Sequence, residues 1–191
     1  MKTKSFISTL VLAVALISGT ATMAQSQMKN ETKVVGGAEM YSTKDIVSNA
    51  VNSKDHTTLV AAVKAADLVA TLQDEGPFTV FAPTNSAFNK LPKGTVETLL
   101  KPENKAKLQS VLTYHVLAGK FSGKDIMKAL EKGNGIASFK TVNGAMIIAM
   151  MEGKSLVLKD TNGQISKVTI ADVNQSNGVI HVVDTVVLPE M

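Results

Sequence analysis

His181 and Asp184 are the two residues whose types and spacing come nearest to a catalytic pair, because an imidazole beside a carboxylate can act as a general base. They lie in the run VIHVVDTVVL, which is rich in β-branched residues and is typical of a strand. Positions i and i+3 of a regular strand point to opposite faces, so we expect the two side chains not to meet. His181 shares its predicted face with Thr185, and a buried hydrogen bond is the role that we expect for it.

Other chemical motifs in the chain are incomplete. Gly153–Ser155 resembles the end of a phosphate-binding loop, but Ile148 stands where that loop needs its first glycine. Gly133–Gly135 lacks the third glycine of a dinucleotide fingerprint, since position 138 is serine. The chain has no cysteine, and its three histidines are scattered, so a zinc site has no local cluster of ligands. We therefore expect no enzyme, no metal site and no cofactor.

Tyr114 and His115 end a stretch with helical periodicity. Leu108, Val111, Leu112 and His115 fall at i, i+3, i+4 and i+7, which places the histidine on the apolar side of a helix or just past its end. A hydrogen-bonded core histidine is the ordinary interpretation of that position. The Tyr114 hydroxyl either projects outward or is partly buried and hydrogen-bonded.

Three methionines, at 146, 150 and 151, lie in the strand-like run AMIIAMM. Met146 and Met150 share one predicted face, and Met151 takes the other. Filling the core is their default role. An adaptable apolar contact surface and a soft ligand for haem or copper remain alternatives.

Asp172 lies between Ile170 and the polar segment NQSNG. Its carboxylate either caps that turn by accepting hydrogen bonds from backbone amides, or it is exposed and completes the metal coordination of a partner. The residues alone leave both roles open.

The segment GPFTVFAPTNSAF, residues 76–88, is expected to build a rigid corner. It holds two of the five prolines and three of the six phenylalanines of the chain. A strand over 79–81 runs into Pro83, and Thr84 and Asn85 are favoured capping residues for the helical turn that follows. Phe81 and Phe88 are then placed in the core.

Helical patterns dominate the first half of the chain and strands the second, which predicts an α+β fold. Helices are expected near residues 57–66, from Pro102 to about His115, and from Lys124 to Lys132. After Gly135 the chain favours strands, and Asn143-Gly144 and Asn162-Gly163 are typical hairpin turns. The last strand is apolar on both faces, so we expect it to be central.

The first 24 residues have the layout of a secretory signal peptide. Lys2 and Lys4 precede an apolar run over residues 6–17, and cleavage is expected after Ala24. Twelve helical residues rise ~18 Å, which is short of a bilayer core of ~30 Å. We therefore expect a secreted or periplasmic protein with no transmembrane segment in the mature chain, a flexible linker over residues 25–42, and one domain over residues 43–191.

The charge of the chain argues against nucleic-acid binding. The net charge is +4, and all twenty basic residues are lysine. Recognition of phosphates and base edges favours the planar fork of arginine. We expect the lysines to form a solvated surface.

Three segments together resemble the signature segments of the fasciclin domain family: TVFAPTNSAF at 79–88, LTYHVLAGKF at 112–121 and ADVNQSNGVIHVVDTVVLP at 171–189. Their order and spacing also match, and the resemblance extends from about Thr43 to Pro189. It implies a compact α+β domain, a sandwich or wedge of about seven strands flanked by several helices. The structural positions of the motif are Phe81, Pro83, Thr84, Asn85, Phe88, Asn177, Gly178, His181 and Asp184.

The resemblance also implies a function, that of a non-catalytic, secreted adhesion or protein-interaction module at a cell surface or in the extracellular matrix. In animal members, an Asp-Ile pair before the NGV segment and the Tyr-His segment are implicated in integrin binding. The matching residues here are Asp172-Val173 and Tyr114-His115. We therefore expect a monomer that contacts a protein or glycan near these four residues. The alternative is a periplasmic or extracellular protein that binds haem or a glycan, with Met150 and His115 as candidate haem ligands.

Overall fold

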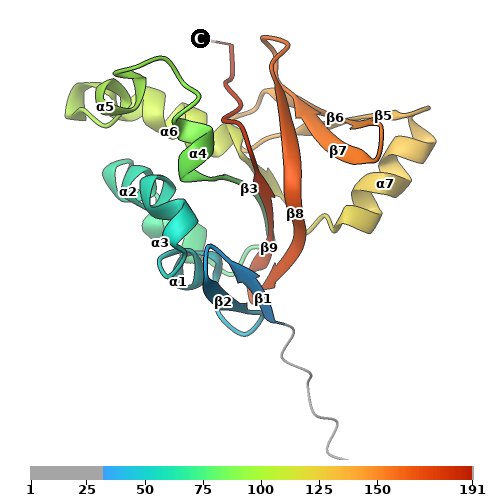
Figure 1. The fold of residues 1–191 in the computed structure, drawn as a ribbon, viewed down its shortest axis with the longest axis horizontal. Coiled ribbons are helices and arrows are strands. Elements are labelled where there is room, and N and C mark those ends of the chain that lie inside the picture. Colours follow the sequence, from blue (N-terminus) through green and yellow to red (C-terminus); the bar gives the residue numbers. More distant parts are fainter. Residues whose placement is uncertain (1–31, 191) are drawn as a thin grey trace, which may run out of the picture.

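The computed structural model describes residues 32–190, in which a curled seven-stranded sheet carries helices on both sides (Figure 1). The strands of this sheet are β3 (Phe78–Pro83), β4 (Val116–Ala118), β5 (Ile136–Lys140), β6 (Met146–Glu152), β7 (Ser155–Lys159), β8 (Ile165–Gln175) and β9 (Gly178–Val183). Their spatial order is β4-β3-β9-β8-β7-β6-β5. The expected α+β fold with seven strands is confirmed.

The sheet is mixed and nearly closed into a barrel. β3 and β9 run parallel, and the other neighbouring strands are antiparallel. A bridge between Leu117 in β4 and Thr141, just after β5, joins the two ends of the sheet. Asn143-Gly144 connects β5 to β6 and Asn162-Gly163 connects β7 to β8, so both predicted hairpin turns are confirmed.

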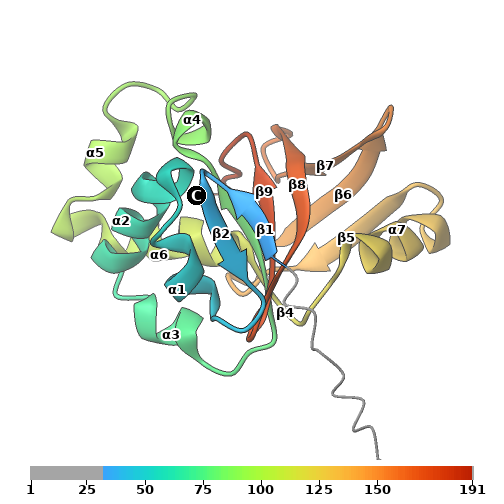
Figure 2. The same ribbon diagram turned by 60° about the horizontal axis from the view of Figure 1, so that its bottom comes forward.

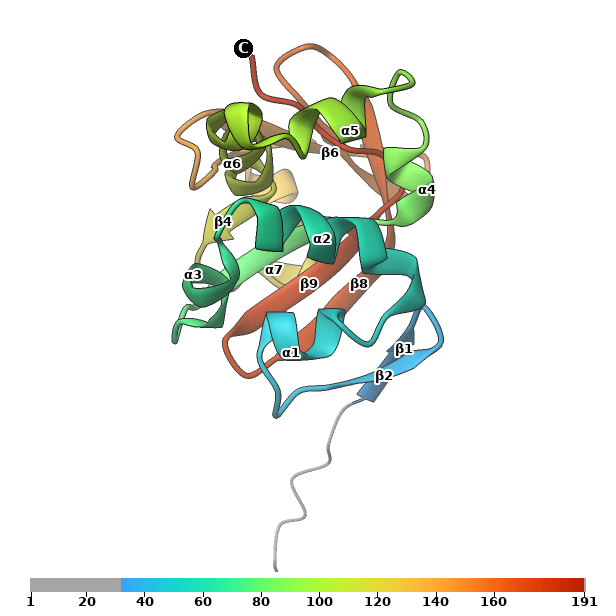
Figure 3. The same ribbon diagram turned by 90° about the vertical axis from the view of Figure 1, so that its left-hand side faces the viewer.

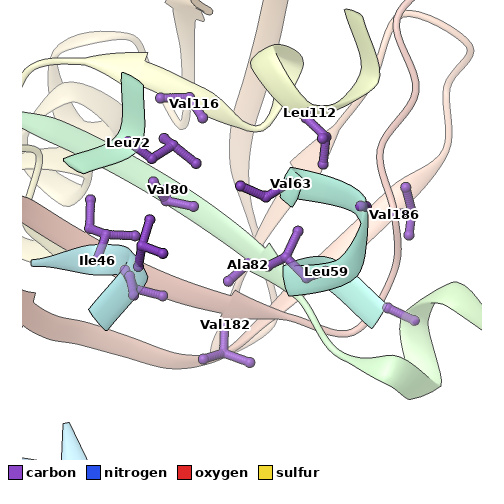
Figure 4. Packing of buried hydrophobic residues seen from close by; sticks show 14 of the residues in the cluster. Ile46, Leu59, Val63, Leu72, Val80, Ala82, Leu112, Val116, Val182 and Val186 are labelled. Atoms are coloured by element: carbon purple, nitrogen blue, oxygen red, sulfur yellow. The ribbon is translucent and has the colours of Figure 1, made fainter. Parts of the chain in front are cut away.

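Helices from the first half of the chain cover the face of the sheet shown in Figure 3. They are α1 (Ile46–Ala50), α2 (Thr57–Ala65), α3 (Val69–Gln73), α4 (Asn85–Phe88), α5 (Thr95–Leu99) and α6 (Lys105–Tyr114), with short 3-10 turns η1 (Lys54–His56) and η2 (Pro102–Asn104). Their apolar side chains pack on Val80, Ala82 and Val182 of the central strands (Figure 4). This packing forms the larger of two hydrophobic cores. No helix within residues 32–190 is both long enough and apolar enough to cross a membrane.

A second core fills the other side of the curled sheet. The helix α7 (Gly123–Lys132) lies there, beside β5 to β7 (Figure 1). It inserts Ile126 and Leu130, which are 0% and 2% exposed, among Phe81, Leu117 and other inward-facing side chains. The hydrophobic effect of burying this apolar helix face against the concave sheet stabilises the near-closed shape.

The expected flexible linker over residues 25–42 is wrong for its second half. β1 (Thr32–Val35) and β2 (Ala38–Tyr41) form an antiparallel hairpin that lies beside α1 and the β8–β9 pair (Figure 2). Val35 and Met40 are each 1% exposed and belong to the larger core. Two strands of four residues are too short to give a recognisable period, which is why the sequence pattern missed them. The expected signal peptide and residues 25–31 lie outside the described residues.

The segment 76–88 forms the predicted corner, with one difference. β3 runs into α4, the Thr84 side chain accepts a hydrogen bond from the Ala87 amide, and Phe81 and Phe88 are buried. Asn85 does not cap its own turn. Its Oδ1 accepts a hydrogen bond from the Thr58 amide at the start of α2, and its Nδ2 donates to the Lys54 carbonyl. The corner is therefore fastened to the helix layer beside it.

Asn177 holds two helix ends against the sheet. Its Oδ1 accepts from the Ile46 amide at the start of α1, at 3.0 Å, and its Nδ2 donates to the carbonyls of Leu72 and Asp74 at the end of α3. The side chain is buried. These three backbone groups have no partner within their own helices, so Asn177 supplies the three hydrogen bonds that the helices themselves lack.

Replacing Asn177 with alanine should lower the free energy of unfolding by about 3 kcal/mol, because buried backbone groups that lose a partner cost about 1–3 kcal/mol each. Urea denaturation followed by circular dichroism measures this. Asn89→Ala, at an exposed position after α4, should change stability by less than about 0.5 kcal/mol. Equal losses in the two variants would contradict the role given to Asn177.

Candidate functional site

Tyr114 and His115, two of the four expected contact residues, are buried. Tyr114 is 0% exposed, and its hydroxyl donates to the Met146 carbonyl at 2.9 Å. His115 is 3% exposed; its Nδ1 donates to the Val111 carbonyl and its Nε2 accepts from the Val187 amide. Neither side chain presents a free polar atom to a partner, so both hold the interior together.

Val173 is also fully buried, and among the four expected contact residues only Asp172 keeps part of its surface in solvent. The Asp172 carboxylate reaches a segment far away in the sequence. Its Oδ1 accepts a hydrogen bond of 2.7 Å from the amide of Gly123, the first residue of α7. The Asp172 backbone has a φ of +58°, which aspartate and asparagine tolerate better than other residues with a side chain.

Asp172, His181 and the start of α7 form one hydrogen-bonded unit. The Asp172 amide donates to His181 Nδ1 at 3.3 Å, and His181 Nε2 donates to the Phe121 carbonyl at 2.9 Å. The bonds require the tautomer of His181 that carries its proton on Nε2. The His181 ring also stacks on Phe81, with 5.7 Å between ring centroids. This unit fastens α7 to β8 and β9.

Asp184 is engaged elsewhere, as expected from strand geometry. Its carboxylate pairs with Lys90 at 3.1 Å and accepts from the Lys167 amide at 2.9 Å. His181 points into the hydrogen-bonded unit described above. The prediction that His181 and Asp184 do not form a dyad is confirmed. The buried hydrogen bond expected for His181 also exists. Its partners are the Phe121 carbonyl and the Asp172 amide, and not Thr185.

All three histidines are buried, and burial lowers the pKa of each. The pKa of His115 falls to about 4, and those of His181 and His56 also lie below the ordinary 6.5. His56 binds Ser53 through Nδ1, and its Nε2 is a buried nitrogen without a hydrogen-bond partner. Desolvation disfavours the charged imidazolium in every case. The histidines are therefore neutral structural groups at physiological pH.

His115 has no free ring nitrogen with which to bind a haem iron, because both nitrogens already form hydrogen bonds. Met146 and Met150 share a face of β6, as predicted, but that face looks outward. Residues 32–190 bring together no group of three His, Asp or Glu side chains suited to a metal ion.

The outward-facing methionines belong to an apolar surface that we call the methionine face, made up of Ile136, Met146, Ile148, Met150 and Ile165. Ile136 pairs with Met150 across β5 and β6, and Ile148 and Ile165 both pair with Lys159 of β7. Ile136, Met146 and Ile165 are 51%, 45% and 38% exposed. Sequence reasoning found Met146 and Met150 through their alternation. It missed Ile136 and Ile165, which join them through strand register.

The charged side chains around the methionine face are mostly basic. Lys140 pairs with Met146, Lys167 pairs with Val157 next to Met150, and Lys159 lies between Ile148 and Ile165. Ser138, Glu152 and Ser155 lie on the same side of the sheet, as does Val157, which is buried. The surface therefore offers apolar contact at its centre and positive charge beside it.

The buried histidines predict a protein that loses stability in mild acid. The unfolded chain binds protons near pH 6.5 and folded His115 only near pH 4, so the unfolded state binds more protons between these values. Stability is present in full above pH 6.5 and is lost as the pH falls. The loss from His115 is about 3 kcal/mol between pH 6.5 and 4, and His181 and His56 add to it.

Urea denaturation at several pH values between 7 and 4 measures this dependence. His115→Gln keeps a donor and an acceptor but does not titrate, so its stability should fall less steeply with acid than that of the parent chain. An unchanged slope in this variant would show that another group is responsible.

Substitutions at Asp172 separate its bond to Gly123 from its backbone strain. Asp172→Asn keeps an acceptor and tolerates positive φ, so stability should change by less than about 0.5 kcal/mol. Asp172→Gly loses only the hydrogen bond to the Gly123 amide, which should lower the free energy of unfolding by about 1 kcal/mol. Asp172→Ala also adds backbone strain, because alanine disfavours positive φ, so its total loss should be about 2 kcal/mol. Thermal unfolding of the three variants gives the order. If the alanine and glycine variants are as stable as the asparagine variant, the hydrogen bond to Gly123 does not contribute to stability.

Comparison with known proteins agrees with this geometry. The model of the fasciclin domain matches residues 54–189. Protein sll1483 of Synechocystis is 44% identical over 197 residues, with both chains covered completely. Immunogenic protein MPB70 of Mycobacterium bovis is 34% identical over 145 residues, which cover 73% of this chain and 66% of MPB70.

A solved structure has the same fold. It is the FAS1 domain pair from the insect cell adhesion molecule fasciclin I, with a TM-score of 0.68 and 19% sequence identity, covering 76% of this chain and 51% of that one. The match of one chain to half of a domain pair agrees with a single copy of the fold in residues 32–190. The chain belongs to the fasciclin domain family.

Proposed function

We propose that the chain is a non-catalytic adhesion or protein-interaction module that acts in the periplasm or outside the cell, at a cell surface or in the extracellular matrix. Its family and its fold, shared with domains of an insect cell adhesion molecule, support this function. The expected signal peptide supports the location. The observation that carries the proposal is the methionine face, an apolar surface on a folded, exposed sheet.

The methionine face has the composition of a docking surface. Methionine is enriched in protein interfaces and adapts its shape to a partner. Ile136 and Met146 are about half exposed although both are apolar, and Ile165 is 38% exposed. Contiguous apolar surface of this kind marks a site of interaction more often than scattered apolar residues do.

The lysines beside the methionine face indicate the charge of the partner. Lys140, Lys159 and Lys167 favour a protein whose apolar contact residues are surrounded by carboxylates, because opposite charges speed association and select the partner. We place the contact on this surface and not at Tyr114, His115 and Val173, because these three residues are buried and cannot touch a partner directly.

The paired substitution Ile136→Glu with Met146→Glu should reduce the attachment of chain-coated beads to cells of its own species by about tenfold or more. It places two carboxylates in the centre of the apolar contact, and each lost contact of 1.4 kcal/mol corresponds to a factor of ten. Folding stability should change by less than about 1 kcal/mol, because both positions are exposed. Attachment of the parent chain should weaken at high salt.

Met127→Glu, at a 38% exposed position on α7, is the matched control and should attach normally. Asp172→Asn tests the rival contact, since it removes the charge and keeps the bond to Gly123. Loss of attachment in Asp172→Asn with normal attachment of the paired variant would move the contact to Asp172. Loss of attachment after enzymatic removal of cell-surface glycans would show that the partner is a glycan and not a protein.

A further inference from the structure

An apolar pocket opens in the helix layer, on the opposite side of the central strands from α7. The space open to the centres of water-sized molecules is about 70 Å³. Side chains from α1, α2, α3, α6, β3 and β4 line it. Five of the lining residues, Ile46, Val63, Leu72, Val80 and Val116, are labelled in Figure 4.

The interior of the pocket has almost no polar group to offer. The His115 nitrogens are bonded to Val111 and Val187, and the Thr113 hydroxyl donates to the Gln109 carbonyl at 2.7 Å. Water in a cavity needs two to four polar partners, and an apolar cavity without them stays dry. An empty space of this kind also forfeits the dispersion contacts that its walls would otherwise make. The walls are therefore suited to hydrocarbon.

The size of the pocket sets the length of that hydrocarbon. One water-sized group occupies about 10–15 Å³. The space open to the centres of such groups is by itself about 70 Å³, so the pocket holds several of them. A methylene group is close to water in size. The space between the helices therefore takes a short alkyl chain, with the remainder of a ligand at the mouth.

Lys64 is the charged residue that lines the mouth of the pocket. It lies in the last turn of α2, one helical turn from Val60, and it is exposed. Its methylene stem can cover the rim while its ammonium group stays in water. The two ion pairs within residues 32–190 are Lys90–Asp184 and Lys105–Asp67, so the Lys64 ammonium is in neither.

We propose that this pocket binds a medium-chain carboxylate, with its alkyl chain between the helices and its carboxylate on the ammonium group of Lys64. The apolar walls select the chain, their volume limits its length, and the cation at the mouth selects the head group. This binding site is independent of the methionine face, which lies on the β5–β8 side of the molecule.

Titration calorimetry of the full chain with sodium octanoate and with 1-octanol tests the proposal. Octanoate should bind saturably and raise the thermal midpoint, and its affinity should exceed that of octanol by about threefold, the scale of one exposed ion pair. Lys64→Gln should abolish that difference without affecting octanol. Lys128→Gln, at an exposed position on α7, is the matched control and should preserve the difference.

Val60→Trp should block the mouth and remove the binding of both ligands. Val60 is half-buried at the rim, and circular dichroism shows whether the variant folds. If it does not fold, nuclear Overhauser contacts between octanoate and the methyl groups of Val63, Leu72 and Val80 decide the location. No saturable binding, binding that persists in folded Val60→Trp, or contacts to other methyl groups would overturn the site. Equal affinity of the parent chain for octanoate and octanol would overturn the role of Lys64.

Discussion

The close parallel contact between β3 and β9 is the constraint on which the rest of the structure depends. Gly178 pairs with Phe78, and a Cβ atom at position 178 would overlap the Phe78 carbonyl oxygen, so the strands approach in a way that a side chain would prevent. Both strands are buried on both faces. Val80 and Val182 enter the larger core, and Phe81 and Val183 enter the core beneath α7.

Buried polar side chains transmit this constraint to the layers on either side. Asn177, directly before Gly178, binds the ends of α1 and α3. His181, in the middle of β9, binds Phe121 and the Asp172 amide and so fixes the start of α7. Most polar groups of the family motif are thus occupied inside the molecule. What remains for recognition lies elsewhere, on the methionine face and at the mouth of the apolar pocket.

Local patterns predicted the elements that depend on neighbouring residues. The Asn-Gly pairs specified two hairpins, Thr84 capped its helical turn, and alternation placed Met146 and Met150 together. Local patterns did not reveal contacts whose partner is distant in the sequence. Asn85 caps α2 instead of its own turn, and Asp172 reaches Gly123, 49 residues away. The hairpin β1–β2 is stable because Val35 and Met40 find a core that is built by later residues.

The sequence by itself determined the α+β class, the central position of the last strand and the corner around Pro83. It also contained three segments whose order and spacing match those of the fasciclin domain family. Tertiary structure decided which of these residues face solvent. Tyr114, His115 and Val173 lie in segments that could equally well be exposed, and all three are buried. Tyr114 lies in the core beneath α7, and Val173 lies in the larger core beneath the helix layer. Exposure depends on contacts between distant segments, and such contacts leave no periodic signal in the sequence. For the same reason, the apolar pocket appears only once six separate elements have packed together.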